Sequence, residues 1–278
     1  MIKKMVIPSA GLGTRLLPVT KEIPKEMMPL FLENKSGEIV VKPLIQILFE
    51  KFYSHKVREF CIIVGRQKRT IEDHFTSDLN FLNNFTRNNR FRKDLEKFYL
   101  MLNSSKIFWI NQQEPKGFGD AVSYSESFVG DDDFLVSAGD TLILNNEQII
   151  CKLINARLKG KYDALLILKE VPDPKRFGVA VVKKVKNRFF VLNVEEKPSK
   201  PKSNLSIVAI YRFKPSIFEA LKKVRYKKNE LQLTDAIQKL IDWGGIVEAI
   251  ILDKNKIVID VGTAESYLNS LEISSKSS

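Results

Sequence analysis

A segment with residue types suited to chemistry lies near the amino terminus, directly after the apolar run Met5–Ile7. Glycines in it would let backbone N–H groups approach an anion closely, and Arg15 and Lys25 would supply charge to neutralise that anion. Leu16 takes the place of the third glycine of a dinucleotide-binding fingerprint, and no Gly-Lys-Ser/Thr follows as in a P-loop. On its own the segment is compatible with a phosphate site or with an ordinary tight turn. It reads Pro8-Ser9-Ala10-Gly11-Leu12-Gly13-Thr14-Arg15.

Short apolar runs alternate with helical patterns over the first half of the chain, which predicts the β-α-β order of a parallel sheet. After Asp163 the apolar runs follow one another with little helix between them, which predicts antiparallel strands added to that sheet. The predicted strands are Met5–Ile7, Phe60–Val64, Ile107–Ile110, Phe134–Val136, Ala164–Glu170, Val179–Val185, Phe189–Val194, Ser206–Phe213, Ile246–Ile251 and Ile257–Ile259. The predicted helices are Leu44–Tyr53, Thr70–Phe75, Asp94–Leu102, Gly119–Glu126, Leu233–Asp242 and Ala264–Leu271.

The lack of repeats and of low-complexity linkers favours one continuous domain over residues 1–273, with a frayed tail at 274–278. The stretch Leu79–Asn103 is predicted to be an inserted helical excursion that is rich in aromatic residues. These aromatics need a partner surface, either in this chain or in another. We therefore expect a homo-oligomer, a dimer or a tetramer.

The formal net charge of +12 predicts that the molecule concentrates anionic ligands around itself. Its basic residues form short dispersed clusters, which favours phosphorylated metabolites over nucleic acid as partners. The apolar runs are far shorter than the roughly 20 residues that cross a bilayer, and Pro8 interrupts the one nearest the amino terminus. We expect a cytoplasmic protein without a membrane partner. Cys61 and Cys151 lack metal-ligand spacing and are expected to be packing residues.

A series of ordered sequence blocks resembles the bacterial-type UDP-glucose pyrophosphorylases, the UTP–glucose-1-phosphate uridylyltransferases, over nearly the whole chain. The first blocks are Ala10-Gly11-Leu12-Gly13-Thr14-Arg15-Leu16-Leu17-Pro18, Thr20-Lys21, Pro24-Lys25-Glu26-Met27 and Pro29-Leu30. The later blocks are Lys42-Pro43-Leu44-Ile45-Gln46, Gln112, Lys116-Gly117-Phe118-Gly119-Asp120-Ala121, Gly139-Asp140, Arg176-Phe177-Gly178, Glu196-Lys197-Pro198, Ser203-Asn204, Leu231-Gln232-Leu233-Thr234-Asp235-Ala236 and Asp260-Val261-Gly262. The resemblance implies the nucleotide-diphospho-sugar transferase fold, an α/β fold with a Rossmann-like mixed β-sheet flanked by helices. It also implies the Mg²⁺-dependent reaction of UTP with α-D-glucose 1-phosphate, giving UDP-glucose and pyrophosphate.

The resemblance assigns catalysis to Arg15, Lys25 and Asp140, and each has suitable chemistry. The planar fork of Arg15 suits the departing pyrophosphate, and Lys25 offers a point charge at the reaction centre. Asp140 follows the strand Phe134–Val136, where the carboxyl ends of parallel strands open into a ligand crevice, and its carboxylate can hold Mg²⁺. Asp260 follows its strand in the same way and is the second metal candidate. Outside these blocks, Lys25 would be interpreted as a solvated loop lysine and Asp140 as a turn residue.

The nucleotide-binding part is expected at roughly 1–145 and the sugar-binding part at roughly 146–273. The amide of Gln112 can both donate and accept, as the edge of uracil requires, and the Gly117 backbone can contribute beside it, although the neighbouring Gln113 is an alternative reader. In the sugar-binding part, Glu196 is expected to accept from sugar hydroxyls and Lys197 to reach the sugar's phosphate, while Gly178 permits close approach of the hexose. The alternative interpretation of Glu196 and Lys197 is an ordinary surface Glu–Lys pair. The nucleotide-binding set is Ala10, Gly11, Leu12, Gly13, Thr14, Arg15, Gln112 and Gly117.

Two departures from the family pattern leave alternatives open. The family commonly has a histidine where this chain has Asp120, and a second aspartate where it has Thr141. A glucose-1-phosphate thymidylyltransferase that uses dTTP is the nearest alternative, and Leu12 argues against it because those enzymes have a longer glycine-rich loop. An inactive sugar-nucleotide-binding regulatory homologue is the alternative of another class, and a nucleic-acid-binding protein would rest on charge alone. An inactive regulatory homologue would have no chemical reason to keep Arg15, Lys25 and Asp140 together.

Overall fold

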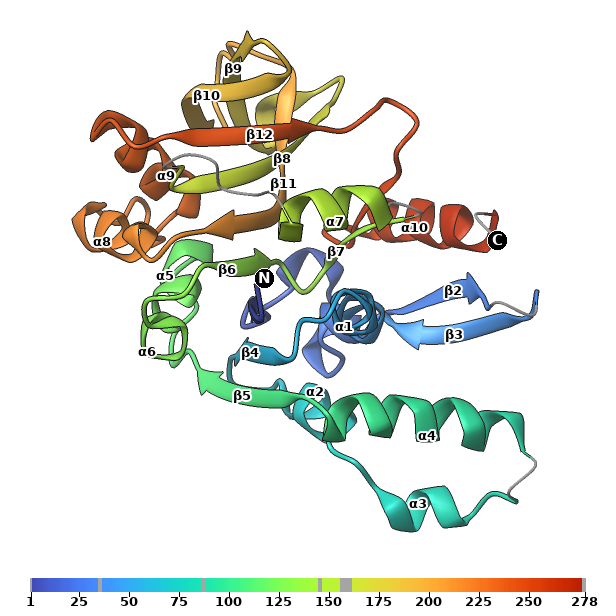
Figure 1. Cartoon of the computed structure of the whole chain (residues 1–278). Helices are drawn as coiled ribbons and strands as arrows, with labels where there is room; N and C mark the ends of the chain where they lie inside the picture. Colours follow the sequence, from blue (N-terminus) through green and yellow to red (C-terminus); the bar gives the residue numbers. More distant parts are fainter. Residues whose placement is uncertain (1, 35–36, 87–88, 145–146, 156–161, 277–278) are drawn as a thin grey trace.

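The computed structural model describes residues 2–34, 37–86, 89–144, 147–155 and 162–276. A nine-stranded mixed sheet runs through this part of the chain in the order β5-β4-β1-β6-β11-β8-β12-β10-β9 (Figure 1). Helices flank the sheet, so the predicted α/β class with a mixed sheet is confirmed. The strands of this sheet are β1 (Lys4–Pro8), β4 (Glu59–Val64), β5 (Lys106–Asn111), β6 (Phe134–Ser137), β8 (Ala164–Glu170), β9 (Gly178–Val185), β10 (Arg188–Glu196), β11 (Leu205–Phe213) and β12 (Val247–Ile251).

Both faces of the sheet are covered, which explains why its first strands are continuously apolar. Side chains alternate along each strand: Met5 and Ile7 of β1 join one hydrophobic cluster, whereas Val6 between them joins the other. The strands β1, β4, β5 and β6 are mutually parallel, as the β-α-β order predicted. Parallel sheets buried on both faces have this unbroken apolar character.

Helices from different parts of the chain cover the two faces. The first cluster includes residues of α1 (Leu44–Ser54), α2 (Arg69–His74), α4 (Arg90–Asn103) and α7 (Glu147–Asn155). The second includes residues of α5 (Phe118–Ser123), α6 (Glu126–Val129), α8 (Ser216–Lys223) and α9 (Leu233–Asp242). The single helix predicted over Gly119–Glu126 is wrong, because α5 ends at Ser123 and α6 begins only at Glu126.

Antiparallel pairs dominate the second half of the sheet, as predicted, although β12 pairs parallel with β8. The strand β11 pairs antiparallel with both β6 and β8, and β9 pairs antiparallel with β10. One further pair, Ser206 opposite Val179, brings β9 back to β11. The predicted strands Ile246–Ile251 and Ile257–Ile259 do not meet, since β12 joins β8 in the main sheet and β13 (Val258–Asp260) pairs with β7 (Thr141–Ile143).

The hairpin of β2 (Pro29–Glu33) and β3 (Ile39–Pro43) was not predicted, and it projects from the sheet in Figure 1. The helix α10 (Ala264–Lys276) packs against it, with the Tyr267 hydroxyl donating to the Pro29 carbonyl at 3.0 Å. Residues 274–276 are therefore helical, and Ser274 is buried, where the sequence predicted a frayed tail. Residues 277 and 278 lie outside the described part.

None of the helices described in this part of the chain is long and apolar enough to cross a membrane.

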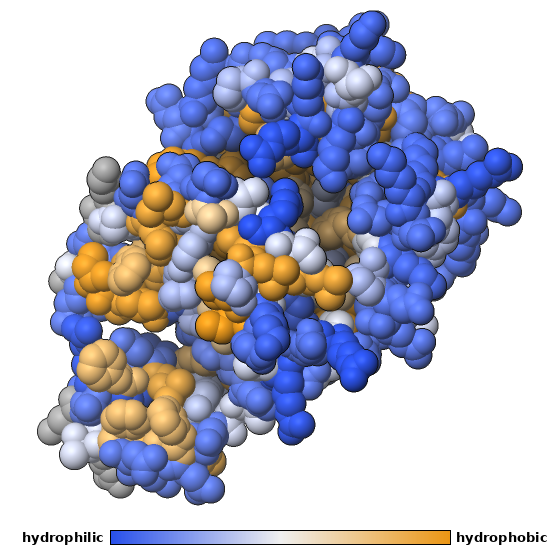
Figure 2. All heavy atoms as spheres, turned by 180° about the vertical axis from the view of Figure 1, so that it is seen from behind, coloured by the Kyte–Doolittle hydropathy of each residue, from blue (hydrophilic) through white to orange (hydrophobic). Residues whose placement is uncertain are grey.

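The predicted excursion forms α3 (Leu79–Asn83) and α4 beside the edge strand β5 (Figure 1). Phe98 anchors α4 to the body, because its ring centroid lies 5.7 Å from that of Phe75 and 6.1 Å from that of Phe49. Phe81 and Phe91 remain exposed, and both line a cavity of about 350 Å³ that residues of β3 also line. Figure 2 shows one apolar group at the lower left, over the excursion, and another above it near the β2–β3 hairpin. Phe98 is therefore buried against the body, whereas Phe81 and Phe91 keep much of their surface exposed.

Candidate active site

The centre of the candidate site is an ion pair between Lys25 and Asp140, 115 residues apart in the chain. Lys25 begins a single helical turn, Lys25–Met27, and Asp140 follows β6. The adjacent Gly139 donates its backbone N–H to the carbonyl of Pro8 at 3.3 Å, so the end of β6 is fixed against the end of β1. A side chain at Gly139 would come within 2.4 Å of the Ser9 hydroxyl oxygen, so this close approach requires glycine. The glycine thus brings Asp140 to the loop that follows β1.

Charges of both signs are crowded around Lys25. Burial alone would lower its pKa, but the charges of Asp140 and Glu26, the hydrogen bond that Lys25 donates to Asp140 and the charge of Asp260 together raise it above its ordinary value. Glu26 is itself buried and accepts from the ammonium of the buried Lys68 at 2.9 Å. Burial raises the pKa of Glu26, and Lys68 and Lys25 oppose that shift. Lys25 therefore remains a cation at physiological pH, held by carboxylates on several sides.

The second metal candidate, Asp260, meets Asp140 through the pairing of β13 with β7. Asp260 lies opposite Thr141 in that register, and the Val261 N–H donates to the Asp140 carbonyl at 3.1 Å. Burial and the negative charge of Asp140 raise the pKa of Asp260 to about 6, against the lowering effects of Lys25 and Arg15. Two carboxylates predicted separately from the sequence thus share one electrostatic environment. No cluster of three or more acidic, histidine or cysteine side chains that could hold a metal is found in the described residues.

Arg15 lies near Asp260 and lines a cavity of about 460 Å³. Asp260, Lys197 and Arg176 also line this cavity. Its three cations are therefore Arg15, Arg176 and Lys197. A Cβ at Gly262 would lie 3.4 Å from an Arg15 guanidinium nitrogen, so Arg15 lies close to the Asp260-Val261-Gly262 segment. Arg176 was missed as a site residue in the sequence, although its place in the Arg-Phe-Gly block was a signal that could have identified it.

The glycine loop takes up the conformation that its residues permit. Gly13 has a φ of +66°, a value that favours glycine, and its carbonyl accepts from the Thr20 hydroxyl at 2.8 Å. Gly11 lies beside the Lys25 side chain, whose Cε would be 3.9 Å from a Cβ at that position. Ala10 is buried, and Leu12 is exposed. Gly11, Leu12 and Thr14 face solvent together with Arg15, so this loop has exposed backbone beside Lys25.

The predicted base-reading group forms a separate cluster. Gln112 is buried after β5 and its side-chain amide donates to Asp120 at 2.6 Å, whereas Gln113 is exposed. Gly117 has a φ of +103°, and a side chain there would lie 2.7 Å from the Leu231 carbonyl. No hydrogen bond or ion pair joins Gln112 to the Lys25–Asp140 pair in the described part of the chain.

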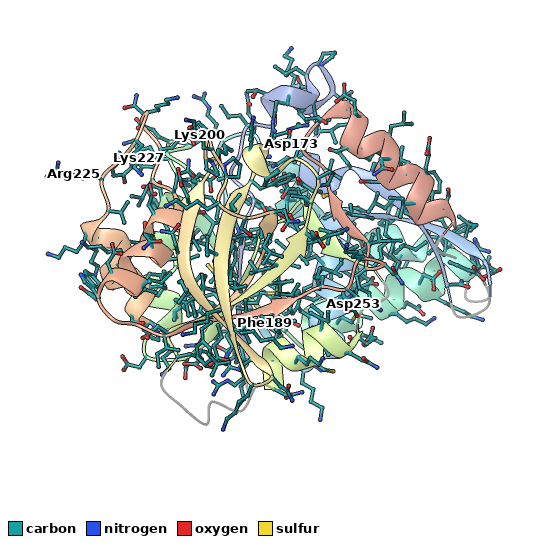
Figure 3. The ribbon with its side chains drawn as sticks, turned by 90° about the horizontal axis from the view of Figure 1, so that it is seen from above. Asp173, Phe189, Lys200, Arg225, Lys227 and Asp253 are labelled. Atoms are coloured by element: carbon teal, nitrogen blue, oxygen red, sulfur yellow. The ribbon has the colours of Figure 1, made fainter. Side chains whose placement is uncertain are left out.

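The predicted sugar-binding residues lie together at the start of β9 and the end of β10. Glu196 accepts from the Thr234 hydroxyl at 2.7 Å, and its other oxygen lies 3.5 Å from the Lys197 ammonium. A Cβ at Gly178 would lie 3.1 Å from Glu196 and 3.0 Å from Thr234, so the missing side chain makes room for this pair. Lys197 also lines the Arg15 cavity, which connects the two groups. Figure 3 shows Asp173, next to the turn that carries Arg176, between α10 and the N-terminal loop.

A mixed α/β sheet whose strand ends gather glycine backbone, clustered cations and a pair of carboxylates defines an enzyme class that handles phosphorylated substrates. A family model described as nucleotidyl transferase matches residues 4–276. The chain therefore belongs to the nucleotidyl transferase family and is a nucleotidyltransferase.

Individual proteins of known sequence or structure are also similar to this chain. The chain is 38% identical over 246 residues to the UTP–glucose-1-phosphate uridylyltransferase of Mycoplasma genitalium, covering 85% of this chain and 80% of the relative. It is 36% identical over 245 residues to the enzyme of the same name from Bacillus subtilis, covering 86% and 80%. A crystal structure of UDP-glucose pyrophosphorylase complexed with UDP-glucose superposes with a TM-score of 0.83 at 27% identity, covering 100% of both chains. The UTP-bound enzyme from Acinetobacter baumannii has a TM-score of 0.81 at 28% identity, covering 98% of this chain and 93% of that one.

Proposed function

We propose that the chain joins UTP to α-D-glucose 1-phosphate and releases UDP-glucose and pyrophosphate. The observation that carries the proposal is the meeting of Lys25, Asp140 and Asp260 beside a cavity lined by Arg15 and Lys197. The named relatives, which this chain matches over most of its length, support the same pair of substrates.

The reaction we propose is direct in-line displacement. A phosphate oxygen of glucose 1-phosphate attacks the α-phosphorus of UTP, and the bond from that phosphorus to the oxygen bridging to the β-phosphorus breaks. Pyrophosphate leaves with the bonding electrons, and no covalent enzyme intermediate forms. Lys25 neutralises the charge that both phosphates share at the reaction centre, and Arg15 neutralises the departing pyrophosphate.

The carboxylates fit a divalent cation, and we propose Mg²⁺. Asp140 and Asp260 supply hard oxygen ligands, and Mg²⁺ commonly uses one or two carboxylates together with phosphate oxygens and water. The raised pKa of Asp260, near 6, reflects burial and the nearby charge of Asp140, and a cation at this place would relieve that repulsion. When bound, Mg²⁺ withdraws charge from the phosphate oxygens.

The chain divides its work between two regions of the sheet in this proposal. Residues 1–145 would hold the nucleotide and 146–273 the sugar phosphate, within one domain. Glu196, which Thr234 orients, would accept hydrogen bonds from the hexose hydroxyls, and Lys197 would bind the sugar's phosphate at the cavity shared with Arg15.

Nucleotide choice tests the proposed function. In a pyrophosphate-release assay with glucose 1-phosphate, we expect UTP to be the best substrate, dTTP to be weaker but measurable, and CTP and GTP to be negligible. A methyl group discriminates by only about 1 to 3 kcal/mol, whereas an unpaired hydrogen-bonding edge costs more. The variant Gln112→Ala should flatten this ranking.

The outcomes separate the alternatives. A preference for dTTP would assign a thymidylyltransferase, and no turnover with any nucleotide would assign an inactive binding homologue. Best activity with CTP or GTP would contradict the role of Gln112.

We also propose a homo-oligomer whose contacts include the excursion. Phe81 and Phe91 are exposed on it, and Ile39 and Val41 are exposed on the β2–β3 hairpin, so a monomer would leave apolar surface in water. Light scattering at micromolar concentration should report a dimer or a tetramer. The double variant Phe81→Glu/Phe91→Glu should be a monomer, while Leu192→Glu on exposed β10 should leave the assembly intact. A wild-type monomer would contradict this proposal.

A further inference from the structure

Asp120 receives two hydrogen bonds from residues far apart in the chain. The Gln112 amide donates to its Oδ2 at 2.6 Å, and the Tyr226 hydroxyl donates to its Oδ1 at 2.8 Å, across 106 residues of sequence. Gln112 and Asp120 are buried, whereas Tyr226 is about half exposed. Both carboxylate oxygens are therefore used as acceptors. In the sequence, Asp120 stands out only as a departure from the family pattern, at a position where the family commonly has a histidine.

This arrangement fixes which end of the Gln112 amide faces Asp120. An ionised carboxylate has no proton to donate, so it can bind only the N–H₂ end of an amide. The N–H₂ end of Gln112 is therefore held against Asp120. The carbonyl oxygen Oε1 makes no hydrogen bond within the described residues and remains available as an acceptor.

The segment that carries Tyr226 is attached to the segment that carries Asp120. The Leu231 N–H donates to the Lys116 carbonyl at 2.7 Å, and the Gly119 N–H donates to the Leu231 carbonyl at 2.9 Å. Tyr226 lines a cavity of about 690 Å³ together with Lys116. The side chains on either side of Tyr226, those of Arg225 and Lys227, lie at the periphery of the molecule in Figure 3. Tyr226 alone of these three makes a hydrogen bond to Asp120 in the described structure.

We propose that Asp120, supported by Tyr226, is a specificity-determining residue that orients Gln112 so that its carbonyl oxygen faces the nucleotide base. The inference rests on the proposed function, in which Gln112 contacts the base. An amide oxygen accepts from the N3–H of a uracil or thymine ring. Cytosine has an unprotonated N3 at the same place, and two facing acceptors repel. Asp120 thus selects bases that carry a ring N–H and rejects cytosine without touching the base.

The test measures kcat/KM for UTP and for CTP in wild type and in Asp120→Asn. Asparagine has nearly the same shape but can present either a donor or an acceptor, so the Gln112 amide can turn over. We expect the UTP:CTP ratio to fall at least about tenfold, the scale of one misdirected hydrogen bond, with an absolute gain in CTP turnover. General damage to the fold would lower both activities and would not create CTP turnover. The exposed Asp131→Asn is the matched control and should keep the wild-type ratio.

A compensating double variant sharpens the test. In Gln112→Glu/Asp120→Asn the asparagine can donate to the new carboxylate and accept from Tyr226, and the second glutamate oxygen faces the base as an acceptor. Side-chain size and net charge are preserved, so the UTP:CTP ratio should recover toward wild type.

The variant Tyr226→Phe removes one of the two hydrogen bonds to Asp120 and should lower the UTP:CTP ratio about threefold. If Asp120→Asn does not fold, the double variant and Tyr226→Phe test the inference. Wild-type ratios in both Asp120→Asn and Tyr226→Phe would overturn the inference, as would a double variant that remains unselective. Wild type that turns over no UTP would instead contradict the proposed function.

Discussion

The variant Lys25→Ala is expected to lower kcat/KM by at least about 10²-fold, the scale of a lost charged contact in a transition state. The physical reason is that Lys25 is the cation nearest Asp140 and stays protonated, because surrounding carboxylates raise its pKa. Steady-state kinetics with UTP and glucose 1-phosphate measures the effect. Lys21→Ala is the matched control, because Lys21 is an exposed lysine whose ion pair is with the exposed Glu22. The activity of this variant should stay near wild type.

The same variant should also change stability in a pH-dependent way. Removing Lys25 leaves the carboxylates of Asp140, Glu26 and Asp260 with less positive charge nearby. The folded-state pKa of Asp260 is already raised to about 6 from an ordinary value of 3.8, so its ionised form disfavours folding and its protonated form does not. The deficit in melting temperature against wild type should therefore be large at pH 8 and shrink as the pH falls toward 6. Unchanged kinetics together with an unchanged melting temperature would show that Lys25 is a solvated loop residue.

The variant Asp140→Asn is expected to cut turnover by about 10²- to 10³-fold at ordinary Mg²⁺ concentrations. Asparagine keeps the shape of the side chain but loses the charge that pairs with Lys25 and would bind the cation. Raising the Mg²⁺ concentration should recover part of the activity, because weaker binding is offset by mass action. A titration of activity against Mg²⁺ measures both the turnover and the shifted midpoint.

Asp132 provides the control for Asp140. It lies just before β6, at the opposite end of the strand from Asp140, and pairs with Lys4 at 2.8 Å. Asp132→Asn should change neither turnover nor the Mg²⁺ midpoint. Wild-type turnover and an unshifted midpoint in Asp140→Asn would remove Asp140 from the site, whatever the activity of the control.

The central strands β1, β4 and β6 could be predicted because they are buried on both faces. Runs such as Phe60–Val64 are apolar throughout, and the structure places β4 there with one additional residue, Glu59. The β2–β3 hairpin could not be predicted in the same way, because within the described residues its strands pair with each other and five of their side chains are exposed. Neither helix pattern nor continuous burial marks such a segment. The end of α10 was misjudged because its serines suggested a tail, whereas Ser274 is buried in the helix.

The sequence by itself determined the chemical types of the candidate site and their local settings. The glycines at 11, 13 and 139, the cations Arg15 and Lys25, and the acids Asp140 and Asp260 were all identifiable from the blocks they occupy. The family resemblance of these blocks was needed for their roles, since local rules alone are equally compatible with a tight turn, a solvated lysine and a turn aspartate.

Only the tertiary structure decided which of these residues meet. Lys25 reaches Asp140 across 115 residues, and Asp260 joins them because β13 pairs with β7 and not with β12. Likewise, Tyr226 reaches Asp120 across 106 residues, so the orientation of Gln112 is set by a loop that gave no signal in the sequence. Charge interactions and hydrogen bonds depend on distance through space. Their partners are fixed only when sheet pairing brings distant segments together.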